Sequence, residues 1–206
     1  MILDELVQRI TDRPKTVGRF VVAIAGPPAA GKTTLAAQLH DALPATTAVL
    51  GLDAFHFDDI VLNARGDRAR KGAPFTFDVE GYRRCLETLI SETSSDVAIP
   101  VFDRKLEVSR NAAAVVPSSC EVIITEGNYL LLDDEPWSGL APLFDLTVFL
   151  DVNEATVHQR IIDRWLNHGL SAADTERRAE TNDLPNARLV LTNSRPADLT
   201  ASPHDL

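Results

Sequence analysis

Residues 26–33 read Gly-Pro-Pro-Ala-Ala-Gly-Lys-Thr, which fits the glycine-rich pattern G-x-x-x-x-G-K-[ST]. This pattern constrains the fold because it requires a β-strand before it and a helix after it. The run at 20–25 is apolar and rich in β-branched residues, as is typical of a buried parallel strand. Apolar residues then recur at helical spacing over 35–43. The sequence therefore predicts a strand, a glycine loop and a helix in succession.

A loop of this kind is predicted to bind phosphate groups. Gly26 and Gly31 allow tight backbone turns, so that several N–H groups point into one concavity at a helix N-terminus. Lys32 should contact the β- and γ-phosphates of a nucleotide, and the Thr33 hydroxyl should bind Mg²⁺. A glycine turn that binds nothing would not account for the flanking strand and helix. The predicted nucleotide-binding residues are Gly26, Pro27, Pro28, Ala29, Ala30, Gly31, Lys32, Thr33 and Thr34.

Length and net charge limit the number of domains and the kinds of partner expected for this chain. The chain has 206 residues, which we interpret as a single domain over 1–206. Its formal charge of −10 argues against nonspecific binding to nucleic acid or anionic membranes. No apolar run is long enough for membrane insertion. Cys85 and Cys120 lack metal-binding spacing, which favours a reduced, cytoplasmic setting.

Apolar runs alternate with helical patterns along the chain, which predicts an α/β fold around a parallel sheet. Helices are expected at the start of the chain and after three capping residues, Asp78, Asn153 and Ser171. The strands expected besides 20–25 are 47–52, 121–125, 146–150 and 189–191.

The regions between these elements are expected to bind the substrate or to cover it. Residues 54–77 show no periodic pattern, so we expect a mobile, basic loop. Residues 97–102 and 112–116 are predicted to pair as a small antiparallel flap, within a substrate region at about 54–117. The helix after Ser171 is mostly polar, which favours a lid at about 160–180. The basic residues of the loop are Arg65, Arg68, Arg70 and Lys71.

Two acids follow predicted strands. Ligands of such sheets bind at the carboxyl ends of the strands, which would place Asp53 and Glu126 beside the glycine loop. Asp53 could accept a proton from a substrate hydroxyl, or it could only cap a helix. Glu126 could help to organise Mg²⁺, or it could form a salt bridge at the end of its strand.

Further polar residues have a functional and a structural interpretation. Asp103 and Arg104 could contact substrate, or they could belong to a solvated turn. Arg160 and Arg164 lie four apart on a predicted helix, where one could contact the transferring phosphate or both could be surface residues. His56 could hydrogen-bond to a substrate or pack in the core.

An ordered set of motifs resembles a known group of enzymes. Beyond the glycine loop, the set comprises Leu52–His56, Arg70–Pro74 with Thr76–Asp78, Pro100–Arg104 and Thr125–Leu131. Together these motifs resemble the superfamily of uridine kinase, phosphoribulokinase and bacterial pantothenate kinase. The chain is most similar to small bacterial proteins named as fructose-transport-system kinases, over roughly residues 18–198.

The resemblance implies a three-layer α/β/α fold of the P-loop NTPase type, with five parallel strands in the order 2-3-1-4-5. It implies ATP and Mg²⁺, with Thr33 and Glu126 near the metal, Asp53 as base, and Arg160 or Arg164 as lid arginine. Adenine should lie after the last strand. The residues expected there are Asn193, Arg195 and Asp198, and those expected around the substrate are Asp53, His56, Arg70, Lys71, Asp103 and Arg104.

The expected activity is transfer of the γ-phosphate of ATP to a hydroxyl of a small molecule, with a sugar such as fructose as the first candidate. Nucleoside, pantothenate-like and sugar-phosphate acceptors stay open, because the acceptor region departs from uridine kinases at Phe102–Lys105 and Arg70–Pro74. A kinase acting on nucleotide monophosphates or a dephospho-coenzyme would fit the same loop and lid, and so would a regulatory protein that binds or hydrolyses ATP. The expected partners are ATP and the acceptor, and a homodimer is left open.

Overall fold

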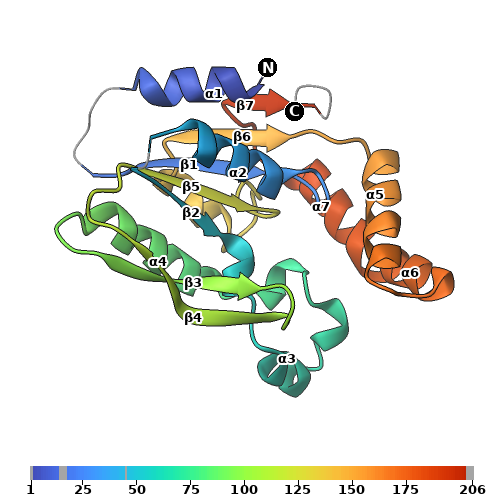
Figure 1. Ribbon diagram of the computed structural model, residues 1–206. Helices are drawn as coiled ribbons and strands as arrows, with labels where there is room; N and C mark the ends of the chain where they lie inside the picture. Colours follow the sequence, from blue (N-terminus) through green and yellow to red (C-terminus); the bar gives the residue numbers. More distant parts are fainter. Residues whose placement is uncertain (1, 14–17, 45, 203–206) are drawn as a thin grey trace.

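A computed structural model describes residues 2–13, 18–44 and 46–202. Its central layer is a parallel sheet of five strands in the order β2-β5-β1-β6-β7 (Figure 1). Counted along the chain, this is the predicted order 2-3-1-4-5. The strands are β1 (Phe20–Ala25), β2 (Thr47–Gly51), β5 (Val122–Gly127), β6 (Leu146–Leu150) and β7 (Leu199–Ala201).

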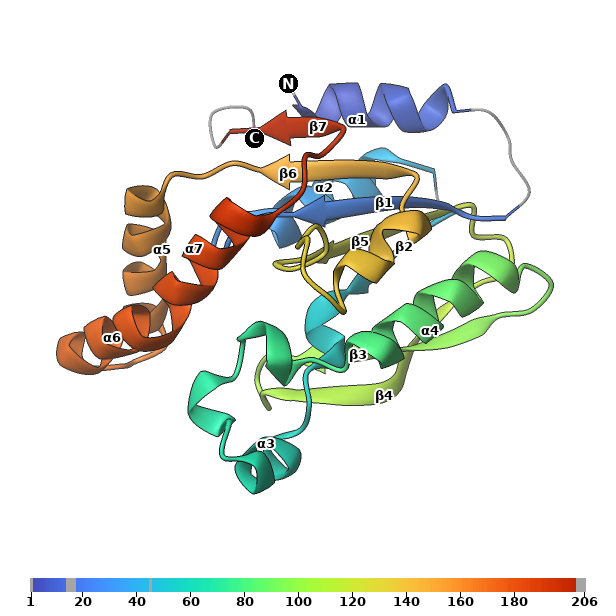
Figure 2. The same cartoon turned by 180° about the vertical axis from the view of Figure 1, so that it is seen from behind.

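Helices cover both faces of this sheet (Figures 1 and 2). Side chains alternate along β1, so that Val22 and Ile24 pack in one hydrophobic core while Val21 and Ala23 pack in the other. The first core includes residues of α1 (Ile2–Thr11) and α2 (Lys32–Ala42), and the second includes residues of α4 (Val79–Ser91). This double burial explains why β1 and β5 read as continuous apolar runs.

The three capping predictions are confirmed. Asp78 accepts a hydrogen bond from the Gly81 N–H at the start of α4, and Asn153 accepts one from Thr156 at the start of α5 (Glu154–Asn167). Ser171 accepts one from the Asp174 N–H at the start of α6 (Ala172–Arg178). Each cap satisfies a backbone donor that the first helical turn leaves free.

The predicted antiparallel flap is present as β3 (Val97–Asp103) and β4 (Val108–Val116). The pairing shifts register between Ile99 and Val101, around Pro100. Proline has no N–H to donate to a ladder, so it is tolerated in a two-stranded edge at an irregularity of this kind.

Residues 54–77 are structured, contrary to the expectation of a mobile loop. Short helices fill the segment, and Lys71 anchors it because its ammonium lies 2.7 Å from Asp59 Oδ1 and donates to the Glu107 carbonyl at 2.9 Å. The sequence pattern missed these helices because each has only three to seven residues. They are η1 (Leu52–Phe55), α3 (Asp59–Arg65), η2 (Arg68–Arg70) and η3 (Pro74–Thr76).

The prediction of a strand at 189–191 is wrong. These residues belong to α7 (Leu184–Asn193), whose Leu184, Ala187 and Val190 are buried at helical spacing. The fifth strand is β7, which is only three residues long and pairs with β6. A short apolar run fits a strand and a buried helix equally well, so periodicity alone does not separate them.

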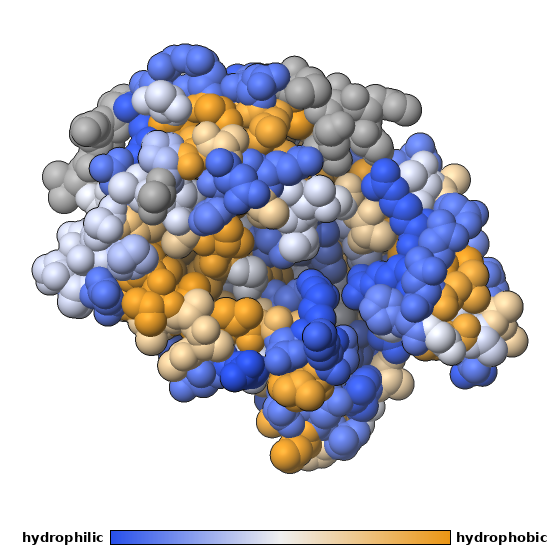
Figure 3. Space-filling view, viewed as in Figure 1, coloured by the Kyte–Doolittle hydropathy of each residue, from blue (hydrophilic) through white to orange (hydrophobic). Residues whose placement is uncertain are grey.

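The remaining helices form an arm on the side where β1 and β6 end (Figure 1). Helix α5 leads to α6, which continues through a π-helical turn, η5 (Ala179–Asp183), into α7. Another short helix, η4 (Ser138–Leu143), precedes β6. The surface is hollowed between α3 and the α5–α6 arm, with hydrophilic residues around the hollow (Figure 3). Among the described residues, no helix has the length and apolar character needed to cross a membrane.

Candidate active site

The glycine loop joins β1 to α2 as predicted, and its backbone explains its sequence. Gly26 has φ 149° and Gly31 has φ 106°, in the region that favours glycine. A Cβ atom on Gly26 would lie 2.8 Å from the Leu150 carbonyl oxygen, so no larger residue fits there. Ala29 also has a positive φ, of 60°, which is uncommon for a residue with a side chain. The loop therefore holds a conformation that its sequence would not adopt without support.

Lys32 begins α2 and is almost completely buried. Its ammonium donates a hydrogen bond to the Pro27 carbonyl at 2.8 Å, which folds the side chain back over the loop. Burial lowers the pKa of Lys32 to about 8, although the charges of Glu126 and Asp53 act in the opposite direction. A buried ammonium between two acids is suited to receive the negative charge of phosphates.

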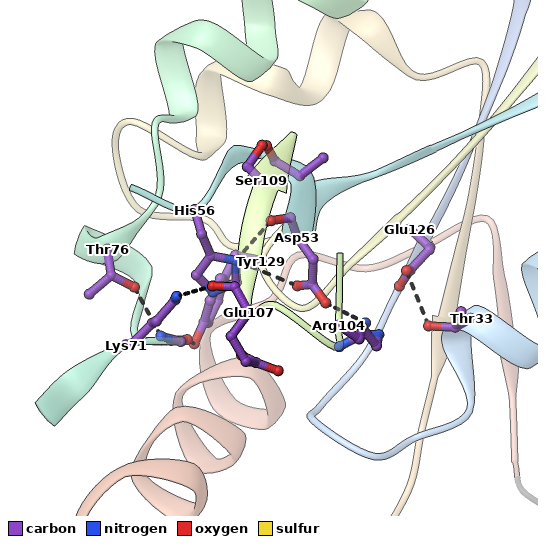
Figure 4. A network of polar contacts seen from close by, with 12 residues as sticks. Thr33, Asp53, His56, Lys71, Thr76, Arg104, Glu107, Ser109, Glu126 and Tyr129 are labelled. Atoms are coloured by element: carbon purple, nitrogen blue, oxygen red, sulfur yellow. Dashed lines mark hydrogen bonds and ion pairs between the residues drawn. The ribbon is translucent and has the colours of Figure 1, made fainter. Parts of the chain in front are cut away.

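Thr33 and Glu126 lie together, as their predicted roles require. The Thr33 hydroxyl donates to Glu126 Oε1 at 3.1 Å (Figure 4). Glu126 is the next-to-last residue of β5 and is only 8% exposed. Burial raises the pKa of Glu126 despite the charge of Lys32. A hydroxyl and a desolvated carboxylate at this spacing form an oxygen donor set of the kind that Mg²⁺ prefers, so these residues fit a bound magnesium ion.

Asp53 lies in η1 directly after β2, whose last residue Gly51 is in register with Glu126. Its Oδ2 forms an ion pair with Arg104 Nη2 at 2.6 Å (Figure 4). Burial alone would raise the pKa of Asp53, but the charges of His56 and Arg104 outweigh burial and lower it. The side chain of Asp53 makes no helix-capping hydrogen bond, so the structure does not support a capping role.

His56 has both a packing and a polar contact. Its ring lies against Phe77, with centroids 3.9 Å apart, and near Phe102 at 5.4 Å. Nδ1 lies 2.9 Å from the Asp53 carbonyl, which can only accept, so Nδ1 carries the proton. Burial lowers the pKa of His56 although Asp53 opposes this shift. An imidazole fixed in this way supports the backbone at Asp53, and its contact with substrate stays a prediction.

The β3–β4 turn separates the roles of two neighbouring residues. Asp103 Oδ1 accepts from the backbone N–H groups of Lys105 and Leu106 at 3.0 and 3.1 Å, and its Oδ2 lies 3.5 Å from Arg110. The structure thus favours the turn interpretation for Asp103. Arg104 is half-exposed and reaches Asp53, so it is the turn residue that belongs to the site.

Arg70 and Lys71 form hydrogen bonds with Asn182, a partner that the sequence did not predict. Arg70 Nε donates to Asn182 Oδ1 at 3.1 Å, and Asn182 Nδ2 donates to the Lys71 carbonyl at 3.1 Å. Tyr129 donates from its hydroxyl to the Gly72 carbonyl at 2.6 Å. Asn182 lies in η5, so these bonds join the substrate region to the arm. Asn182 gave no local signal, because it lies 112 residues from Arg70.

Arg160 reaches the glycine loop from α5. Its Nη1 donates to the carbonyls of Ala29 and Ala30, at 3.2 and 3.3 Å. Arg164, one helical turn later, is exposed, and its charge contributes to lowering the pKa of Lys32 after the larger effect of burial. Arg160 therefore acts on the loop backbone, and Arg164 is the better candidate for the lid arginine.

Replacing Arg160 should weaken the loop. In Arg160→Gln, the carbonyls at Ala29 and Ala30 lose a charged donor that stabilises the strained φ of Ala29. We expect the KM for ATP to rise about 10-fold with a smaller change in kcat, which corresponds to roughly 1.4 kcal/mol of binding. Steady-state kinetics of Arg160→Gln beside Arg188→Gln, a half-exposed arginine on α7 that pairs with Glu154, would measure the difference. An unchanged KM for ATP would contradict the role in the loop.

The adenine site was expected after the last strand, but that strand is misplaced, and contact of the expected residues with adenine stays a prediction. Asn193, Arg195 and Asp198 precede the last strand instead of following it. Asp198 Oδ2 accepts from the N–H and the hydroxyl of Thr147, at 2.8 and 2.6 Å near the start of β6. This is the amino-terminal edge of the sheet, opposite the glycine loop. The error follows from the misplaced fifth strand.

Thr34 is exposed on α2, and the prediction that it binds nucleotide is unchanged.

A P-loop at the carboxyl edge of a five-stranded parallel sheet, with acids at the carboxyl ends of the adjacent strands β5 and β2, defines a P-loop kinase fold. The chain belongs to the phosphoribulokinase/uridine kinase family, whose model matches residues 21–172.

Many known proteins are similar to this chain, among them the following three. Protein YggC of Escherichia coli K12, which is uncharacterized, is 36% identical over 187 residues, covering 88% of this chain and 76% of YggC. C227.14 of Schizosaccharomyces pombe, a candidate uridine kinase, is 30% identical over 207 residues, covering 95% of this chain and 88% of C227.14. The crystal structure of a candidate fructose transport system kinase from Silicibacter sp. TM1040 superposes with a TM-score of 0.91 and 40% identity, over 98% and 99% of the two chains.

Proposed function

We propose that the protein is an ATP-dependent kinase that phosphorylates a hydroxyl group of a small molecule. The observation that carries this proposal is the position of Asp53, one strand from Glu126 at the P-loop edge, where surrounding charges lower the pKa of Asp53. A carboxylate that stays ionised there is suited to accept a hydroxyl proton.

The residues divide the reaction between them. Lys32 and the loop N–H groups hold the β- and γ-phosphates, and a magnesium ion held by Thr33 and Glu126 would neutralise phosphate charge. The acceptor hydroxyl oxygen forms a bond to the γ-phosphorus as its proton moves to Asp53 Oδ, and the bond from that phosphorus to the bridging oxygen breaks to release ADP. Arg164 is placed to contact the transferring phosphoryl group from α5.

A sugar such as fructose is the first acceptor to test. The support is the 40% identity to the Silicibacter protein, which is named as a kinase of a fructose transport system. The similarity to C227.14 favours a nucleoside instead, so uridine is the second candidate.

An acceptor screen tests the proposal directly. ADP release would be measured with ATP and Mg²⁺ in the presence of fructose, other hexoses, ribonucleosides, pantothenate, sugar phosphates or nucleoside monophosphates. We expect one class to raise the rate well above that without acceptor, and Asp53→Asn to remove this stimulation. A slow rate that no acceptor changes would favour a regulatory protein that hydrolyses ATP.

The pH dependence of kcat/KM for ATP should follow the ionisation of the Lys32 ammonium. The free protein needs this ammonium charged to capture ATP, and its pKa is about 8, so kcat/KM for ATP should fall as the pH rises through about 8. Bound phosphates favour the charged form, and the alkaline limb of kcat should therefore lie at higher pH. Rates from pH 6 to 10 would test this. Lys32→Arg, which stays charged, should lack the limb near 8, and a wild-type profile flat to pH 10 would refute the assignment.

The lid prediction can be tested by proteolysis. Residues 160–180 should close on substrate, because water must be kept from the γ-phosphate. Trypsin cleavage after Arg177, an exposed residue of α6, should slow several-fold with a nonhydrolysable ATP analogue and acceptor. Cleavage after Arg84, an exposed residue of α4, serves as the control and should not change. Equal slowing at both sites would indicate global stabilisation and not lid closure.

A further inference from the structure

A second group of metal-binding side chains lies away from the P-loop. His158 on α5, Glu176 on α6 and Glu180 in η5 each present one ligand atom, and these atoms all lie within 4.8 Å of one another. Within the described parts of the chain, no other three His, Cys, Asp or Glu residues meet so closely. The group bridges two helices of the arm.

The imidazole of His158 has one polar atom without a hydrogen-bond partner. His158 Nε2 is shielded from solvent and makes no hydrogen bond. It lies 3.4 Å from Glu176 Oε1, and the pair is an ion pair only if the ring is protonated. A shielded nitrogen without a partner is unfavourable, and a cation between it and the carboxylates would satisfy it.

The nearby arginines make their hydrogen bonds and ring contacts with groups other than the two carboxylates. Arg177 pairs with Asp174 at 2.6 Å, and Arg178 lies over the Trp165 ring at 4.0 Å. Arg188 on α7 donates two hydrogen bonds to Glu154. The Glu180 carboxylate makes no hydrogen bond or ion pair with any described residue, although its charge helps to raise the pKa of Arg188 after the larger effect of Glu154. The two carboxylates and His158 Nε2 thus lie together between α5 and α6 with no described arginine hydrogen-bonded to them.

We propose that His158 Nε2 and the carboxylates of Glu176 and Glu180 bind one divalent transition-metal cation of the Zn²⁺, Co²⁺ or Ni²⁺ type. One imidazole with two carboxylates suits these ions, whereas Mg²⁺ prefers oxygen ligands alone. Glu176 and Glu180 project from one side of their helix four residues apart, and His158 comes from a different helix. The ion therefore ties α6–η5 to α5, the helix whose Arg160 holds the glycine loop.

Calorimetric titration of the full chain with Zn²⁺, Ni²⁺ and Co²⁺ tests the site. We expect one equivalent to bind, and His158→Gln and the double variant Glu176→Gln/Glu180→Gln each to weaken binding at least about 10-fold. The matched control is His40→Gln/Asp41→Asn, which changes another histidine–carboxylate pair, 3.4 Å apart on α2. It should bind the metal as the wild type does. All variants keep Thr33 and Glu126, so any binding there is common to them.

Two further measurements keep the test decisive. Glu176→His adds a second imidazole and should tighten Ni²⁺ binding at least about 10-fold. At 100 times the wild-type dissociation constant, the metal should raise the Tm of the wild type by about 5 °C or more, and that of His158→Gln by about half as much or less. Affinities equal in all variants, or no binding of these ions at millimolar concentration, would overturn the proposal.

Discussion

Lys32→Ala should nearly abolish turnover while leaving the protein folded. The ammonium stabilises charge that develops between the β- and γ-phosphates, and losing such a contact costs on the order of 3 kcal/mol, or at least about 10²-fold in kcat/KM. Stability should not fall in parallel, because burial disfavours the charged side chain and lowers its pKa to about 8. The measurements are steady-state rates with the acceptor found in the screen, and the Tm with and without Mg·ATP.

The control for this variant is Lys105→Ala, since Lys105 is an exposed lysine in the β3–β4 turn. It should keep its rate, its Tm and the increase in Tm caused by Mg·ATP. Lys32→Ala should keep its Tm but lose most of that increase. Wild-type turnover by a well-folded Lys32→Ala would contradict the assignment of the P-loop as the site of phosphate transfer.

The features that sequence alone predicted are those encoded within a few residues. The glycine loop has its own motif, and its strand and helix follow from apolar spacing on either side. Asp78, Asn153 and Ser171 predicted their helices because a cap acts only within its first turn. The rule that ligands lie at the carboxyl ends of parallel strands then placed Asp53 and Glu126 together, and their strands are indeed neighbours.

The features that were missed depend on partners distant in sequence. The Arg104–Asp53 ion pair spans 51 residues, and no local pattern distinguishes Arg104 from Asp103, which stabilises the turn. Arg160 fits a surface helix in sequence, yet its guanidinium binds the loop 131 residues earlier. The error at 189–191 is of another kind, because three apolar residues are too few to reveal a period.

Asp53→Asn should lower kcat by about 10² or more, with little change in the affinity for Mg·ATP. The amide keeps the shape and reach of the carboxylate but cannot accept the hydroxyl proton. The wild-type carboxylate needs no raised pKa for this task, since the proton leaves late in a loose transition state. Its ion pair with Arg104 is partly exposed, so losing the pair should affect stability little.

A metal-ligand role or a capping role for Asp53 would give different results. A metal ligand would show weakened Mg·ATP binding, and added Mg²⁺ would partly restore the rate. A helix cap would show an unchanged kcat and stability in Asp53→Asn, because Asn caps as well as Asp, and a loss of about 1 kcal/mol in stability only in Asp53→Ala. Asp58→Ala is the matched control for the loss of a cap, because Asp58 caps α3 by accepting from the Ile60 N–H at 2.8 Å. Measuring kcat, Mg·ATP affinity and Tm on these variants separates these roles, and an unchanged kcat in Asp53→Asn would exclude Asp53 as the base.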